Sequence, residues 1–152
     1  MTIKEEYNKL QKKYNLPNFE DMNNEFEIIT IEKIDFLLRE IRRKISEKIE
    51  LLAKLLEGIL QPETTLTHFK ESNIFSDEER EEVYGLFRSL MFFHRASIET
   101  ALNENDKKTA DFINSFWKKW TKIKNNLEKT VKKVKDSWEK ETEFKQELSY
   151  IR

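Results

Sequence analysis

Glycine and proline are nearly missing from this chain, and their scarcity limits its possible folds more than any other feature. The 152 residues include two glycines and two prolines. Together they are about 2.6% of the chain, whereas glycine and proline make up about 12% of average proteins. A β-sandwich or β-barrel needs a turn about every 8–12 residues, and glycine and proline make many of those turns. The sequence therefore predicts an all-α protein.

The composition also excludes several kinds of chemistry. Without cysteine, the chain forms no disulfide, thiol nucleophile or cysteine-ligated metal site. It contains no glycine-rich phosphate loop. Its two histidines, His68 and His94, stand in no H-E-x-x-H or E-x-x-H motif. We therefore predict no catalytic residue, no metal, no cofactor and no small-molecule substrate, and so not an enzyme.

Charge and aromatic content point to a folded protein. The 28 basic and 29 acidic residues nearly cancel, so the net charge favours neither nucleic acid nor anionic lipid. Eighteen aromatic residues (11 Phe, 3 Trp, 4 Tyr) are more than disordered segments contain. The first residues do not resemble a signal peptide, and no apolar run approaches membrane-spanning length. We expect a cytoplasmic protein without a membrane segment.

Hydrophobic periodicity predicts an N-terminal helical hairpin over residues 1–30. The first helix covers 2–15, and Asn18 caps a short second helical turn that continues through Phe26. The apolar seam of the first helix consists of Ile3, Tyr7, Leu10 and Tyr14.

Three long helices follow, and the spacing predicts them over 31–60, 77–102 and 107–138. Pro62 ends the first of them, and a connector over 61–75 leads to a capping box formed by Ser76 and Glu79. The break at residues 103–106 is short, so the last helix should return antiparallel. The predicted fold is an antiparallel bundle of three long helices with the N-terminal helical hairpin. Residues 1–152 should form a single domain with the three-helix core at 31–138.

Residues 139–152 are predicted as a C-terminal helical extension. Phe144, Leu148 and Ile151 are displaced by about 80–140° from Trp138 on a helical wheel. An apolar stripe displaced this far does not face the same core, so it must pack against another segment. Our hypothesis is that residues 138–151 pack against residues 2–15, either within one chain or exchanged between two chains.

The helix over 77–102 has a second face made largely of small residues. We interpret this face as a candidate partner surface, with the alternative that the helix is simply the central one of the bundle. Its residues are Gly85, Ser89, Phe92 and Ala96. On the opposite side of the same helix, we expect His94 to be a core histidine bonded to a backbone carbonyl or to Ser97. We expect His68 to be an exposed loop residue.

The last helix presents lysines opposite its apolar stripe. They form a candidate phosphate-binding ridge, with a solvated basic face as the alternative. The ridge consists of Lys118, Lys119, Lys122, Lys129, Lys132 and Lys133. Four basic residues of the first long helix, Arg39, Arg42, Arg43 and Lys44, could extend it, although the acidic residues Asp35, Glu40 and Glu47 dilute their charge.

Two segments, 36–45 (FLLREIRRKI) and 56–66 (LEGILQPETTL), make the chain resemble small uncharacterised all-helical proteins of archaeal type. The resemblance covers about residues 15–138 and includes no catalytic motif. It implies a helical cytoplasmic protein and assigns no site residue.

The sequence thus favours a non-enzymatic helical interaction protein, an adaptor or an assembly component, with a protein partner or self-association. The alternative function is a nucleic-acid-associated protein that binds phosphates through the lysine ridge.

Overall fold

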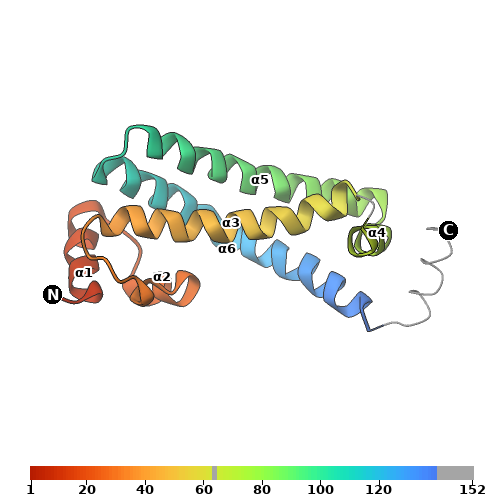
Figure 1. The fold of residues 1–152 in the computed structure, drawn as a ribbon, viewed down its shortest axis with the longest axis horizontal. Coiled ribbons are helices and arrows are strands. Elements are labelled where there is room, and N and C mark those ends of the chain that lie inside the picture. Colours follow the sequence, from red (N-terminus) through yellow and green to blue (C-terminus); the bar gives the residue numbers. More distant parts are fainter. Residues whose placement is uncertain (63–64, 140–152) are drawn as a thin grey trace. The chain divides into compact units, whose positions relative to one another are not determined.

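A computed structural model of the chain describes residues 1–62 and 65–139. It confirms an all-α antiparallel bundle of three long helices with an N-terminal helical hairpin (Figure 1). The described elements are α1 (Ile3–Tyr14), α2 (Phe19–Phe26), the 3-10 turn η1 (Ile28–Thr30), α3 (Leu37–Leu60), α4 (Leu66–Asn73), α5 (Asp77–Leu102) and α6 (Asp106–Ser137).

The contacts divide the chain into two compact units. The first unit comprises Met1–Glu50 and Phe92–Trp120. The second comprises Leu51–Met91 and the residues from Thr121 onward. Each long helix therefore contributes one part to each unit. The expectation of a single domain over residues 1–152 stays a prediction.

The N-terminal hairpin of the first unit forms as predicted, and both of its helices begin at a capping residue. Thr2 and Glu5 make a reciprocal capping box at the start of α1, and the Asn18 side chain accepts hydrogen bonds at the start of α2. The Tyr7 hydroxyl donates a 2.6 Å hydrogen bond to the Pro17 carbonyl oxygen, and burial raises the pKa of Tyr7. The seam of α1 is thus covered by α2 and η1. The proposed partner segment of α1 at 138–151 lies almost entirely outside the described residues.

The first long helix begins later than predicted, at Leu37 rather than at residue 31. Ile31 has extended backbone angles and is buried. Phe36 adopts a φ of 58°, which a right-handed helix does not allow. Its ring lies under the Arg39 guanidinium, 4.4 Å from the ring centroid. The apolar residues at positions 31–36 therefore belong to a loop and not to the stripe of the first long helix.

Aromatic side chains fill the core of the first unit around Phe116. The Phe116 ring contacts four other rings at centroid distances of 5.2–6.4 Å. These are the rings of Phe26, Phe93, Phe112 and Trp120. Residues 112, 116 and 120 follow one another at helical i,i+4 spacing, so α6 presents them as one stack.

In the second unit, the predicted connector contains a helix, α4, that holds the end of α6. Lys70 is 1% exposed and donates a 2.8 Å hydrogen bond to the Ser137 carbonyl oxygen. Its ammonium also lies 4.6 Å from the centroid of the Trp138 ring. The adjacent Glu71 accepts a 3.0 Å hydrogen bond from the Trp138 indole nitrogen. Of the apolar residues of this segment, Phe75 is buried and Leu66 is exposed.

The capping box that starts α5 is confirmed. The Glu79 backbone N–H donates to the Ser76 hydroxyl at 3.2 Å, and the Ser76 N–H donates to the Glu79 carboxylate at 2.9 Å. Hydrogen bonds from Lys133 and from the Ser76 backbone lower the pKa of Glu79 to about 2. Residue 79 therefore both caps α5 and contacts α6.

Replacing the capping hydroxyl should destabilise the protein. Ser76→Ala leaves a helix N–H without its acceptor, and we expect a loss of about 0.5–2 kcal/mol in the free energy of unfolding, measured by urea denaturation. Ser115→Ala, on an exposed middle turn of α6, is the control and should change it by less than about 0.5 kcal/mol. Equal effects of the two substitutions would show that the cap contributes nothing.

The two glycines occupy opposite environments. A Cβ atom added at Gly58 would lie 2.7 Å from the His68 ring, whereas one added at Gly85 would meet no atom within 4 Å. His68 is thus a half-buried residue of α4 packed on α3, not an exposed loop residue. Its Nδ1 has no hydrogen-bond partner among the described residues.

Alanine should therefore have opposite effects at the two glycines. Gly85→Ala should stabilise the protein by about 0.5–1 kcal/mol, because alanine is the better helix former. Gly58→Ala should destabilise it by about 1–3 kcal/mol, because the methyl group collides with the imidazole. Thermal and urea unfolding measure both. In a His68→Ala background the Gly58→Ala penalty should disappear; if it persists, the collision is not its cause.

Candidate protein-interaction surface

Phe92 is an exposed aromatic residue on a long helix, and it lines a groove. It lies on α5 in the first unit and is 67% exposed. The groove runs between the last turns of α5 and the first turns of α6, with Phe92, Phe93 and Phe112 as its aromatic residues. Its remaining lining is small or polar: Ala96, Glu99, Thr100, Asn103, Lys108, Asp111 and Ser115.

The Phe92 ring is fixed by the core beneath it. It meets the buried Phe93 ring edge to face, with centroids 5.2 Å apart. Phe93 in turn meets Phe116 edge to face at 5.4 Å. This geometry is one that aromatic pairs prefer. The exposed ring is therefore positioned by a continuous series of ring contacts from the core.

The four residues of the predicted partner face are divided between the two units. Phe92 and Ala96 line the groove in the first unit. Gly85 and Ser89 belong to the second unit and do not line it. The Ser89 hydroxyl donates to the Gly85 carbonyl oxygen at 3.2 Å, and Gly85 is exposed. The face stays a prediction, and the groove supports the Phe92 part of it.

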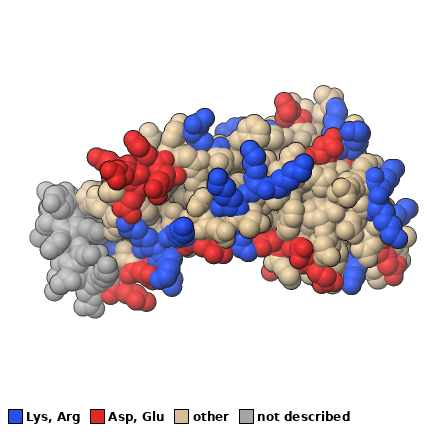
Figure 2. Space-filling view, turned by 180° about the vertical axis from the view of Figure 1, so that it is seen from behind, with Lys and Arg blue, Asp and Glu red and all other residues tan. Residues whose placement is uncertain are grey.

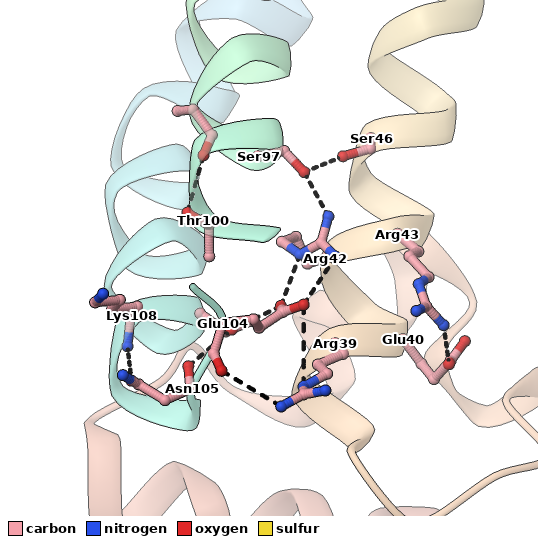
Figure 3. A network of polar contacts seen from close by, with 12 residues as sticks. Arg39, Glu40, Arg42, Arg43, Ser46, Ser97, Thr100, Glu104, Asn105 and Lys108 are labelled. Atoms are coloured by element: carbon pink, nitrogen blue, oxygen red, sulfur yellow. Dashed lines mark hydrogen bonds and ion pairs between the residues drawn. The ribbon is translucent and has the colours of Figure 1, made fainter. Parts of the chain in front are cut away.

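A buried ion pair lies in the same unit, and sequence reasoning missed it. Arg42 of α3 donates two hydrogen bonds to the Glu104 carboxylate, at 2.8 and 3.0 Å (Figure 3). The two side chains are 8% and 7% exposed. A third guanidinium N–H donates to the Ser97 hydroxyl at 2.9 Å, and Ser97 is also hydrogen-bonded to Ser46. Bidentate pairing of this kind is among the strongest hydrogen bonding in proteins.

Glu104 sits in the turn between α5 and α6, and its neighbours hold it ionised. Burial opposes its charge, but hydrogen bonds from Arg42 and Thr109 outweigh that cost, so the pKa of Glu104 is lowered. The Arg39 guanidinium adds a 3.4 Å hydrogen bond to the Glu104 carbonyl oxygen. The arrangement fixes the turn and offers no nucleophile or raised-pKa acid for catalysis.

The four basic residues in the first turns of α3 bind groups of the first unit. Arg42 and Arg39 contact Glu104, Arg43 pairs with Glu40 at 2.6 Å, and Lys44 donates to the Thr30 hydroxyl. These contacts do not favour their expected role as an extension of a phosphate-binding ridge.

The six lysines of the predicted ridge lie on α6, four of them in the second unit. Lys132 pairs with Asp136 at 2.8 Å, and Lys133 pairs with Glu79. The other four are exposed. Figure 2 shows basic side chains in separate groups with acidic side chains among them. Phosphate binding by the ridge stays a prediction.

His94 is half-buried, and its ring contacts differ from those predicted. The Arg95 guanidinium lies 2.6 Å from His94 Nδ1. The Ser97 hydroxyl contacts Arg42 and Ser46 instead. His94 is therefore not a core histidine bonded to Ser97.

The described residues contain neither a metal-binding cluster of side chains nor a membrane-spanning helix. No group of three or more histidine, aspartate or glutamate side chains there is placed to hold a metal ion. Within the same residues, no helix has the length and apolar character needed to cross a membrane.

The chain matches no protein-family model, and it has no significant match among curated proteins or solved structures.

Removing the buried carboxylate should destabilise the fold strongly. Glu104→Gln leaves Arg42 buried without its counter-charge, so we expect a loss of about 3–5 kcal/mol in the free energy of unfolding. Glu40→Gln breaks the more exposed pair with Arg43 and should cost at most about 1 kcal/mol.

The same variant should change the pH dependence of stability. A carboxyl whose pKa is lowered on folding stabilises the native state above its unfolded pKa, and that contribution disappears as pH falls through the folded value. The stability difference between wild type and Glu104→Gln should therefore shrink below about pH 4.5, the usual glutamate pKa. Urea unfolding at a series of pH values measures it. A difference that does not depend on pH would contradict the ionised, buried Glu104.

Proposed function

We propose that this chain is a non-enzymatic helical interaction protein, an adaptor or an assembly component, which binds a protein partner through the Phe92 groove. The observation that carries the proposal is Phe92 itself, an exposed aromatic ring held by core aromatics at the edge of a groove.

The groove has the composition of a binding hot spot. Such sites combine a few large aromatic anchors with a polar rim that excludes water. Here the aromatic part is Phe92, Phe93 and Phe112, and the rim carries Glu99, Lys108 and other polar residues. Because the Phe92 ring already packs on Phe93, binding would cost little side-chain entropy.

Other large apolar side chains of the described chain are also exposed, among them Leu51 and Leu102. Single exposed apolar residues are common on protein surfaces and need no function. Phe92 differs from Leu51 because it lines a groove beside two further aromatic rings. Leu51 therefore serves as the matched control, an exposed apolar residue of similar exposure outside this groove.

The test compares Phe92→Asp with Leu51→Asp. Each variant, carrying an affinity tag, is expressed in the cells from which the sequence derives, and the bound proteins are quantified by mass spectrometry. We expect wild type and Leu51→Asp to retain the same partner and Phe92→Asp to lose it. Both substitutions are at exposed positions, so both proteins should stay folded; Leu51→Asp should change the free energy of unfolding by about 0.5 kcal/mol or less, and Phe92→Asp should lower it by at most about 1.5 kcal/mol, through the lost contact with Phe93.

A benzoylphenylalanine at residue 92 should in addition crosslink to that partner or, for self-association, to a second copy. The proposal fails if Phe92→Asp retains every partner that wild type retains, or if residue 92 crosslinks to nothing.

A further inference from the structure

A second groove lies in the second unit, between the last turn of α3 and the first turns of α5. Its apolar part consists of Leu60, Tyr84 and Phe87, and Tyr84 is 54% exposed. Its polar part is mainly acidic and consists of Glu57, Gln61, Asp77, Arg80 and Glu81.

The acidic charge of this groove is only partly compensated. Arg80 is committed to its own neighbours, donating to the Ser72 carbonyl oxygen at 2.7 Å and lying 3.6 Å from Asp77. Glu57 and Glu81 are exposed, and neither forms an ion pair within the described residues. Figure 2 shows acidic side chains gathered where α5 begins. A cationic group in the groove would therefore meet two carboxylates without counter-ions.

Helix energetics do not explain these two carboxylates. Acidic residues in the first turn of α5, such as Asp77, favour the helix through its dipole. Glu81 lies beyond that first turn. Glu57 lies in the last turn of α3, where a negative charge opposes the dipole. Neither position stabilises its helix, so their charge is available for a partner.

We propose that this groove binds a basic amphipathic segment of a partner protein. The segment's apolar side chains would pack on Leu60, Tyr84 and Phe87, and its lysine or arginine side chains would pair with Glu57 and Glu81. Apolar contact gives the affinity, and the complementary charge selects basic segments and speeds their association. The inference rests on the proposed function, an interaction protein, and assigns it a second surface with a defined chemistry.

The test uses two synthetic peptides of about 14 residues, roughly four helical turns. One has leucine on one helical face and lysine on the other, and its match carries glutamate in place of lysine. Fluorescence anisotropy measures their affinity for the full chain at low and high salt. We expect the lysine peptide to bind, more weakly at high salt, and the glutamate peptide not to bind.

Matched variants localise the binding. Glu57→Gln combined with Glu81→Gln should weaken the lysine peptide about fivefold to tenfold at low salt, and Tyr84→Ser should weaken it at both salt concentrations. Glu47→Gln, which removes an exposed carboxylate of α3 in the first unit that lines neither groove, should have no effect. Backbone amide shifts caused by the peptide should cluster at residues 57–61 and 80–87.

Unchanged binding by the double variant, or amide shifts elsewhere, overturns the proposal. The pure chain could also associate with itself, and the double variant could abolish that association. The groove would then bind a second copy of the chain, which would also overturn the proposal. Phe92→Asp separates the two proposals. If the wild-type chain does not bind the lysine peptide but still retains a partner that Phe92→Asp loses, only this inference fails and the proposed function stands.

Discussion

The first unit depends on one buried ion pair, between Arg42 of α3 and Glu104 in the turn that joins α5 to α6. Removing a carboxylate from water costs several kcal/mol unless a cation and hydrogen bonds replace the water. Arg42 supplies the cation, and Thr109, at the start of α6, supplies a further hydrogen bond. One carboxylate therefore sets the register of three helices, because a turn shifted along α3 would leave Glu104 buried without its partners.

In the second unit, a cation likewise pairs with a polar group that would otherwise lack a partner, here at the end of α6. There α4 directs Lys70 to the Ser137 carbonyl oxygen, one of the carbonyls that a helix end leaves without an internal partner. A positive charge at that position also suits the negative end of the helix dipole. Glu71, the next residue, accepts from the Trp138 indole. Two consecutive polar residues of an eight-residue helix thereby fix the last described turn of a helix far away in sequence.

Sequence reasoning succeeded where structure is decided locally. The caps at Asn18 and Ser76 and the extent of α5 depend on residues within a few positions of one another, and all were predicted. It failed at the start of α3, because a bulky residue such as Phe36 rarely adopts a positive φ and no residue pattern in the sequence indicates one there. It also missed α4, whose buried residues are largely polar. Glu104, the acidic partner of Arg42, and Ser137, whose carbonyl oxygen Lys70 binds, each lie more than 60 positions from these cations, so no local pattern reveals them. The same applies to the groove: the helical wheel identified Phe92 and Ala96, but not the α6 residues opposite them.

The exposure of Phe92 follows from the burial of its neighbour. Consecutive residues of a helix point about 100° apart, so once Phe93 joins the aromatic core, residue 92 is directed to the flank of α5. The core therefore requires an aromatic residue at 93 and makes no such demand at 92. A polar side chain at 92 would keep every contact of Phe93 with Phe116 and would avoid exposing an apolar ring. The edge-to-face contact with Phe93 gives the phenylalanine a small part in the stability of the unit, and the proposed partner in the groove would give it a second role.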